Sequence, residues 1–300
     1  MRNTILFIPV ILLTAACQQM EQESHLTPDA PAQSEITSGK VTILAAKGTP
    51  ETKALDLVND GATLNAYWKN GETVKVYKAG TLLGTLDVTP FEGSKPTNAT
   101  LSGSITVTGL SQDDQLTLLL PRETWDYTGQ NGVLTGTGSL EDSYAYATAT
   151  VTVLSIAGSS VTTSKAAFVN AESIYRFGFK LEDNYIDPKS FTVSATGGQL
   201  VQSMNWNGSA WAPSYGSITV ASALAPADHF FYVSLRNDRT EADTYHFVIT
   251  GADDALYIAS KTIPANVLDA PRFISAKSIA VSQPSLVPAN GVINDPENVF

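Results

Sequence analysis

The chain of 300 residues contains one cysteine, Cys17, so no disulfide can form within it. Burial of apolar side chains must therefore stabilise the fold, and about 260 residues of globular sequence suffice for one large or two ordinary domains. Stretches rich in Glu, Lys and Leu, which are typical of helices, are scarce, whereas Thr, Ser, Gly, Val and Ala are abundant. This bias favours sheet over helix.

Basic residues are outnumbered as well, with 18 Lys and Arg against 29 Asp and Glu and a net charge of -11. A chain this acidic is a poor candidate for binding nucleic acid or an anionic membrane surface, so we expect no nucleic-acid partner. Beyond residue 16 no apolar run approaches the roughly 20 residues of a membrane-spanning helix. Any attachment to a membrane would then be through a lipid.

The beginning of the chain has the layout of a secretory signal, with an apolar segment over residues 5–16 behind a single positive charge at Arg2. This segment is too short to span a bilayer. Thr14-Ala15-Ala16 supplies the small residues that a lipoprotein signal peptidase needs before a cysteine, although leucine is more usual at the place of Thr14. We predict a signal peptide at residues 1–16 and a lipid on Cys17. The alternative is an ordinary secretory signal followed by an incidental cysteine.

Residues 17–39 are polar, contain two prolines and show no periodicity, so we expect them to form a flexible tether. The rest of the chain divides into two stretches of strand-like sequence, at residues 40–170 and 171–300. Each has the length and the turn spacing of a β-sandwich domain.

Within residues 40–170, short runs of alternating character are separated by turn residues. Asn70-Gly71 between two such runs is a tight-turn signal and predicts a hairpin over residues 64–77. Residues 144–154 alternate small apolar side chains with Tyr and Thr, which predicts a long strand. Four more strands are expected, at residues 41–44, 81–88, 101–107 and 116–120.

Residues 171–300 continue in the same style, beginning with an aromatic strand at residues 174–181. Turns recur without helical periodicity, which indicates a second antiparallel sandwich. Short helices are expected only near residues 170–174 and 263–268, and residues 284–300 are expected as a tail or a docked edge. The further strands expected here lie at residues 191–193, 218–220, 230–235, 245–249, 256–258 and 272–281.

Five short motifs stand out among these runs: TKAL at residues 52–55, WKNGETVKVY at 68–77, Pro121 before YTGQNG at 127–132, TTSKAAFVN at 162–170, and a hairpin pattern over 247–257. In combination they resemble the fimbrillin family of Bacteroidetes surface lipoproteins, the subunits and subunit-like proteins of type V pili. The resemblance extends over most of residues 40–280. Glu21 and Glu23, close behind Cys17, are similar to the acidic tags that accompany outer-surface export in these bacteria.

The resemblance implies an all-β fold with two tandem transthyretin-like antiparallel β-sandwich domains, carried as a surface-exposed lipoprotein of the outer membrane or as part of a fimbria. It implies a non-enzymatic pilus subunit or pilin-like adhesin. Its partners would be other pilus subunits, joined by donor-strand exchange, the outer membrane through the lipid on Cys17, and surface glycans or proteins as adhesion targets.

In polymerising members of this family a protease specific for arginine or lysine removes the first strand, and the strand of a neighbouring subunit fills the groove. This chain has no arginine between Cys17 and Pro121, so the candidate processing sites are Lys47 and Lys53. Residues 41–44 would be the removed strand. A member that is not trimmed would remain anchored by its lipid.

Signatures of catalysis and of metal or phosphate binding are weak. Neither His229 nor His246 lies beside a nucleophile-elbow pattern, and no histidine and cysteine stand at a metal-binding spacing. Asp113-Asp114 and Asp253-Asp254 are interpreted as turn residues and not as calcium ligands. We therefore expect no enzymatic activity, no cofactor and no metal site.

The strongest binding candidate lies at residues 205–215, where Trp206, Trp211 and Tyr215 flank Asn207-Gly208. Aromatic rings with neighbouring amides can stack on sugars, which makes a surface glycan-binding lipoprotein the alternative function. A hairpin that turns at Asn207-Gly208, with the tryptophans paired across it, is the favoured interpretation.

Overall fold

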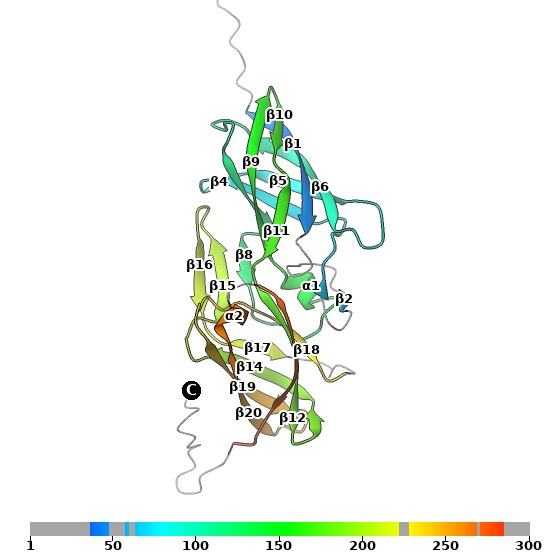
Figure 1. Cartoon of the computed structure of the whole chain (residues 1–300), viewed down its shortest axis with the longest axis vertical. Coiled ribbons are helices and arrows are strands. Elements are labelled where there is room, and N and C mark those ends of the chain that lie inside the picture. The colour runs from blue at the N-terminus through cyan, green and yellow to red at the C-terminus, as the bar shows by residue number, and fades with distance from the viewer. Residues whose placement is uncertain (1–36, 48–57, 60–63, 222–227, 269–270, 285–300) are drawn as a thin grey trace, which may run out of the picture. The chain divides into compact units, whose positions relative to one another are not determined.

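The computed structural model describes residues 37–47, 58–59, 64–221, 228–268 and 271–284 (Figure 1). The signal peptide, Cys17, Lys53 and nearly all of the expected tether therefore lie outside the described residues. All described residues belong to one unit of the chain, Ile36–Phe300. The fold is almost entirely β, as the composition predicts, and the two short helices among the described residues are α1 (Leu140–Ser143) and α2 (Ala265–Leu268).

The first sheet has eight strands and closes on itself, because β1 pairs with strands at both ends of the series. Going around, β1 pairs with β6, then come β5, β4, β7 and β9, and β10 and β11 lie between β9 and β1. The strands are β1 (Ser38–Lys47), β4 (Thr73–Lys78), β5 (Thr81–Pro90), β6 (Asn98–Thr106), β7 (Gln115–Leu120), β9 (Ala147–Ala157), β10 (Ser160–Thr163) and β11 (Ala166–Asn170).

Alternation along these strands explains why they form. In β9 the side chains of Ala147, Ala149, Val151 and Val153 are buried, whereas the residues between them are at least partly exposed. The buried faces of all the strands meet in one apolar core, in which the rings of Trp68 and Phe168 pack in a T shape with their centroids 5.4 Å apart.

The predicted hairpin over residues 64–77 is wrong. β3 (Leu64–Asn65) pairs with β2 (Val58–Asn59), whereas β4 pairs with β5 and β7. Asn70-Gly71 does turn the chain, and Lys69 beside it forms an ion pair with Glu141 of α1. This turn joins two different sheets, because β3 belongs to the two-stranded sheet and β4 to the eight-stranded one. The hairpin partner of β4 is the next strand, β5.

The later part of the chain forms two facing sheets. One contains β13, β12, β18 and β21, and the other has the order β17-β14-β19-β20. Phenylalanines from both sheets meet edge to face, with Phe179 and Phe191 at 5.1 Å and Phe177 and Phe247 at 5.3 Å. The strands are β12 (Ser173–Leu181), β13 (Asn184–Ile186), β14 (Pro188–Ala195), β17 (Ile218–Ala221), β18 (Phe231–Leu235), β19 (Asp243–Gly251), β20 (Leu256–Ile263) and β21 (Phe273–Ala280).

Most strand pairs are antiparallel, as expected, and the exceptions involve the first and last long strands. β1 runs parallel to β10 and β11, and β21 runs parallel to β12. Parallel neighbours need a long connection between them, so they are far apart in sequence and leave no local turn signal.

A third sheet connects these two parts of the chain. β15 (Val201–Trp206) pairs with β16 (Trp211–Tyr215) on one side and with β8 (Thr124–Asp126) on the other. Trp125, Tyr127 and Tyr146 are buried in the apolar core of the later sheets, although they precede residue 171. The division into domains at residues 40–170 and 171–300, and the transthyretin-like form of each, stay predictions.

The helices differ in part from expectation. α2 lies within the segment expected to be helical at residues 263–268, but residues 173–174 begin strand β12. α1 was not expected, and it starts where the side chain of Ser139 accepts a hydrogen bond from the backbone of Asp142. None of the helices in the described part of the chain is long and apolar enough to cross a membrane.

Candidate functional site

The first strand is the main candidate for a functional element, because both of its edges are paired. On one side β1 is antiparallel to β6 from Ser38 to Ala46, and on the other it is parallel to β10 and then to β11. The expected strand at residues 41–44 is therefore real and longer than predicted. A strand paired on both sides contributes two rows of hydrogen bonds to its sheet.

Alternate side chains of β1 point into the core of the closed sheet. Val41, Ile43 and Ala45 are each 1% exposed, whereas Leu44 between them is 53% exposed. Lys47 is the last residue of the strand, and its backbone is paired with Phe168 of β11. Of the two predicted processing sites, Lys47 thus marks the end of β1, and Lys53 lies outside the described residues together with Cys17.

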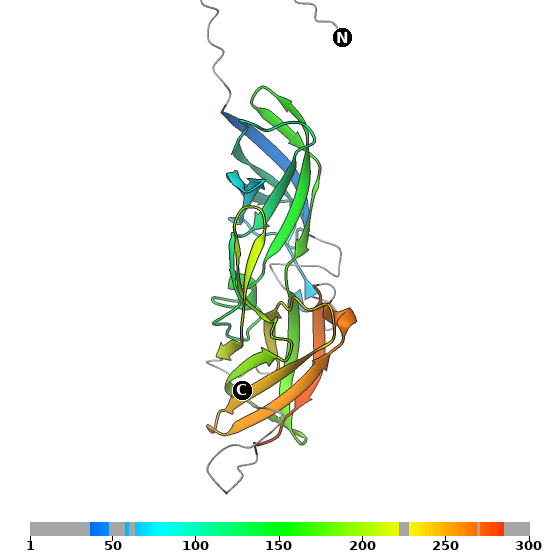
Figure 2. The same cartoon turned by 90° about the vertical axis from the view of Figure 1, so that its left-hand side faces the viewer.

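The tryptophan segment forms the predicted hairpin, in which Trp206 is paired with Trp211 across β15 and β16. Asn207 shapes the turn, because its side-chain oxygen accepts hydrogen bonds from the backbone N–H groups of Ser209 and Ala210. The tip of the hairpin reaches the turn between β4 and β5 (Figure 2), where Gly208 lies directly against Gly80. A distant part of the chain therefore supports the end of this hairpin.

The rings of this hairpin are packed against other aromatic side chains. Trp211 lies on Trp125 with 3.7 Å between ring centroids, and Trp206 contacts Trp211 at 5.3 Å and Tyr77 at 6.1 Å. Both hairpin tryptophans are partly buried, whereas Tyr215 is 43% exposed. The structure thus brings Trp206 and Trp211 together, while Tyr215 forms a separate hydrogen bond with Asp238.

A buried carboxyl group occupies the connection between β11 and β12. Glu172 is 2% exposed, and its two oxygens accept hydrogen bonds from the backbone N–H of Tyr146 at 3.0 Å and the hydroxyl of Tyr127 at 3.3 Å. Burial raises its pKa to about 8, although these hydrogen bonds and the charge of Arg236 act in the opposite direction. Glu172 is therefore mainly protonated at neutral pH.

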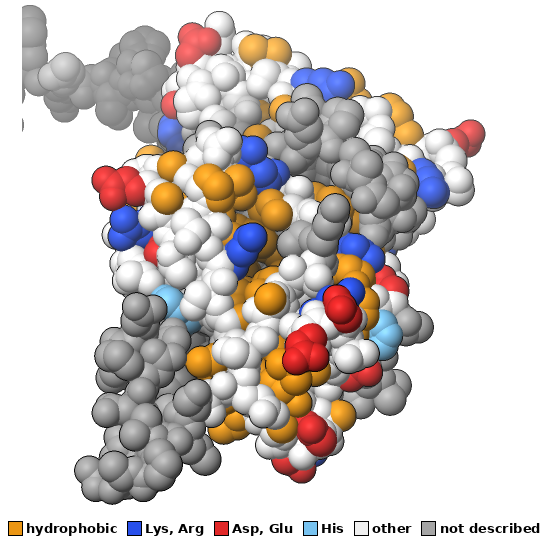
Figure 3. Space-filling model, turned by 60° about the horizontal axis from the view of Figure 1, so that its bottom comes forward, with side chains coloured by type: hydrophobic (Ala, Val, Ile, Leu, Met, Phe, Trp, Pro, Cys, Tyr) orange, Lys and Arg blue, Asp and Glu red, His pale blue; other side chains and the backbone are white. Residues whose placement is uncertain are grey.

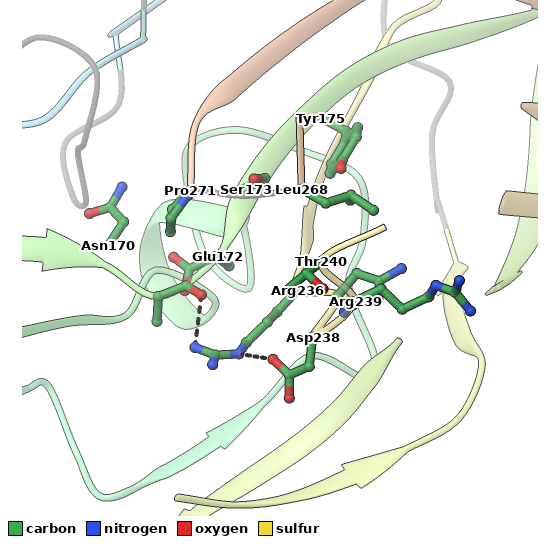
Figure 4. Close-up of a pocket in the computed structure, with 12 residues that line it drawn as sticks. Asn170, Glu172, Ser173, Tyr175, Arg236, Asp238, Arg239, Thr240, Leu268 and Pro271 are labelled. Atoms are coloured by element: carbon green, nitrogen blue, oxygen red, sulfur yellow. Dashed lines mark hydrogen bonds and ion pairs between the residues drawn. The ribbon is translucent and has the colours of Figure 1, made fainter. Parts of the chain in front are cut away.

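Glu172 also borders a small pocket of about 250 Å³ (Figure 4). Arg236 reaches across this pocket, where its Nε donates to Asp238 at 2.8 Å and its Nη1 donates to the carbonyl of Ala171 at 3.1 Å. Arg239, on the same loop, is paired with Glu241. Both arginines therefore already have carboxylate partners within the chain.

Sequence reasoning missed Glu172 and Arg236. Their partners Tyr127, Tyr146 and Ala171 lie 26 to 65 residues away along the chain, and only Asp238, the other partner of Arg236, is close in sequence. One signal was present, since Glu172 directly precedes a long apolar strand, where an acidic residue must be either exposed or buried with partners.

The two histidines that the structure describes, His229 and His246, lie on a loop and on a strand surface. His229 pairs with Asp187 at 2.7 Å, and the ring nitrogens of His246 contact the hydroxyl groups of Thr196 and Ser260. Among the residues the structure describes, no group of three or more His, Cys, Asp and Glu side chains could hold a metal ion. Figure 3 shows a face on which acidic and basic side chains are interspersed, so no basic tract crosses that face.

Comparisons with known proteins give distant structural similarities. No family model and no curated protein sequence matches this chain. A "putative cell adhesion protein" from Bacteroides fragilis NCTC 9343 is 11% identical with a TM-score of 0.44, over 82% of this chain and 96% of that one.

Two further solved structures have similar coverage. A fimbrial assembly protein from Parabacteroides distasonis ATCC 8503 is 11% identical with a TM-score of 0.36, over 80% of this chain and 90% of that one. The shaft pilin of Lactobacillus rhamnosus GG is 12% identical with a TM-score of 0.34, over 84% of this chain and all of that one.

Replacing Gly208 with alanine should detach the hairpin tip from the β4–β5 turn. Gly208 has φ +100°, and an added methyl group would overlap the backbone of Gly80. We expect G208A to lower the free energy of unfolding by about 1–3 kcal/mol and to weaken the near-ultraviolet circular dichroism of the tryptophans. The matched control is G71A, because Gly71 has φ +86° but no atom within 4 Å. Equal losses for both variants would show that the contact with Gly80 is unimportant.

The buried carboxyl group should make stability depend on pH. The pKa of Glu172 is about 8 in the folded protein against an ordinary 4.5, so between pH 5 and pH 8 the folded state keeps a proton that the unfolded chain releases. The free energy of unfolding must then fall as the pH rises through this range. We expect E172Q to lose this pH-dependent fall in the free energy of unfolding, and therefore to gain stability relative to the parent at pH 8. Urea unfolding measures both.

The control for that measurement is E241Q, which removes a carboxyl group that is 82% exposed. Its pH profile should follow that of the parent protein. If the free energy of unfolding of E172Q also falls as steeply as that of the parent between pH 5 and pH 8, Glu172 is ionised in the folded state and the assignment of a protonated carboxyl group is wrong.

Proposed function

We propose that this protein is a fimbrillin-like, non-enzymatic surface lipoprotein that acts as a pilus subunit or pilin-like adhesin and assembles by donor-strand exchange. The observation that carries the proposal is the position of β1. It is the first described strand, it is paired on both sides, and it fills the core of a closed sheet with alternate side chains.

Removing β1 would open the sheet along its whole length. β6 would lose its antiparallel partner over nine residue pairs, and β10 and β11 would lose their parallel one. The places of Val41, Ile43 and Ala45 would become apolar pockets at every second position of the groove. An incoming strand with the same alternation restores both the hydrogen bonds and the buried area, which is the logic of strand addition.

Cleavage at either candidate lysine would separate the whole strand from the rest of the chain. β1 ends at Lys47, so a cut after Lys47 or after Lys53 leaves every residue of β1 on the N-terminal fragment. The only cysteine, Cys17, lies on the same fragment, so no disulfide retains it. Hydrogen bonds and apolar contacts alone then hold β1 in place.

Anchoring and assembly would be alternatives for one molecule. An uncut chain keeps Cys17, and a lipid there holds it at the outer membrane. A cut chain loses that anchor together with β1 and becomes competent to accept a strand. We therefore assign two locations to the protein, the surface of the outer membrane before cleavage and the fimbria after it.

The first residue of the mature protein on intact cells tests this assignment. We expect either lipid-modified Cys17 or a new terminus at Gly48 or Ala54, read by mass spectrometry of protein shaved from the cell surface. A terminus between Val41 and Lys47 would contradict removal of the intact strand. An unmodified Cys17 would contradict the lipid anchor.

Strand exchange can be measured directly. A protein with a specific protease site inserted between Lys47 and Lys53 is cleaved and mixed with a fluorescent peptide of residues 37–47. We expect the cleaved protein to exchange its own β1 for the labelled peptide and the uncleaved one to exclude the peptide, because only in the uncleaved protein is β1 covalently tethered beside its groove.

The control peptide carries Val41→Asp and Ile43→Asp, which places two charges in apolar pockets. It should bind at least a hundredfold more weakly than the parent peptide. Equal uptake of both peptides, or uptake by the uncleaved protein, would rule out a specific groove.

A further inference from the structure

A row of polar side chains lies along the extended segment that contains β8. Arg122, Thr124 and Asp126 are exposed and Thr128 is half-buried, whereas Trp125 and Tyr127 between them are buried. The backbone of Glu123 and Tyr127 continues the ladder with β15, which keeps the whole segment extended. Four side chains therefore share one face, with successive ones about 6.5–7 Å apart.

This row forms one side of a cleft of about 380 Å³, and Ser143 and Tyr144 at the end of α1 form the other. Small-molecule sites have volumes of about 300–1,000 Å³, so the cleft is at the small end of that range. It is separate from the groove of β1 and from the rings of Trp206 and Trp211.

A buried tyrosine holds the two sides of the cleft together. The hydroxyl of Tyr146 accepts a hydrogen bond from the backbone N–H of Asp126 at 3.1 Å and lies 3.0 Å from the carbonyl oxygens of both Asp126 and Ser143. Arg122 donates to the carbonyl of Ser143 at 3.1 Å and lies over the ring of Tyr146. The cleft is therefore fixed before any ligand arrives, which reduces the entropy cost of binding.

The groups that face the cleft have unused hydrogen-bonding capacity. In the part of the chain that the structure describes, the hydroxyls of Thr124, Thr128 and Tyr144 make no hydrogen bond. Asp126 uses one carboxylate oxygen to accept from the backbone of Thr128 at 2.8 Å, so its other oxygen is available. Arg122 forms no ion pair with any described residue, and its bonds use only one of its terminal nitrogens.

We propose that this cleft binds a neutral sugar ring. The available groups are one cation, one anion and three hydroxyls, so donors and acceptors are mixed and the charges cancel. An anionic or cationic ligand would meet one attractive and one repulsive charge, and an apolar ligand would leave these polar groups unpaired. A ring with several adjacent hydroxyl groups offers a donor and an acceptor at each position and can satisfy all of them.

An extended peptide fits this cleft less well. Strand addition needs free backbone groups at a sheet edge. On the outer edge of β8, the N–H of Asp126 donates to Tyr146, and its carbonyl lies within reach of the same hydroxyl. The contacts available to a ligand here come from side chains. This inference does not rest on strand exchange, since the cleft is present in the uncleaved chain.

Retention on an array of neutral and acidic glycans tests the proposal, with the full-length protein in detergent micelles. We expect retention on neutral glycans that persists from 50 mM to 500 mM salt. The ligand is neutral and the charges of the cleft cancel, so salt has little electrostatic attraction to screen. Saturation-transfer NMR with the retained sugar then gives relative affinities for the variants.

Two variants should weaken binding at least tenfold. D126N keeps the oxygen that accepts from Thr128 but replaces the available acceptor with a donor, and T124V removes a hydroxyl while preserving shape and strand propensity. The matched control, D183N, changes an exposed aspartate in the turn between β12 and β13 and should bind like the parent. Unchanged thermal unfolding of each variant shows that the fold is intact.

Several results would overturn the proposal. These are the absence of retention on every neutral glycan, retention on acidic glycans alone, affinity that D126N and T124V leave unchanged, and binding that is lost in W211A but kept in D126N. The last result would place the sugar on the tryptophan hairpin instead.

Discussion

The double-sided pairing of β1 is the interaction on which the first sheet depends. Seven other strands form a series whose ends do not meet, and β1 joins them by pairing with β6 at one end and with β10 and β11 at the other. No disulfide supports this closure, because the chain has no second cysteine. The core under β1 is therefore closed by contacts that an equivalent strand could replace, and this property is the basis of the proposed assembly.

The later sheets depend on a different principle, the packing of large rings. Phenylalanines from facing sheets contact one another edge to face, and the aromatic side chains of Trp125, Tyr127 and Tyr146 extend this core toward the first sheet. Glu172 accepts hydrogen bonds from the hydroxyl of Tyr127 and from the backbone N–H of Tyr146. The connection between the strand sets thus combines apolar burial with one protonated carboxyl group.

Alternation along the chain was enough to predict most strands, because a half-buried strand shows it within five to ten residues. The hairpin of Trp206 and Trp211 was predictable for the same reason, since Asn207-Gly208 lies between its paired residues. Partners that are distant in sequence were not predictable. The parallel pairing of β1 with β10 and the hydrogen bonds of Glu172 arise from tertiary packing, and the run at residues 64–65 found a partner other than the one its turn suggested.

A closed sheet has no free edge, and under the proposed assembly this has a consequence for the protein between cleavage and strand donation. If β1 were removed as proposed, β6 and the β10–β11 side would each present unpaired backbone groups beside exposed apolar pockets. Such edges pair with any available strand, including identical edges on other molecules, and lead to aggregation. The proposed assembly would therefore require cleavage and strand donation to be coupled in time, because a pool of cut, unfilled subunits would be the most aggregation-prone state of this protein.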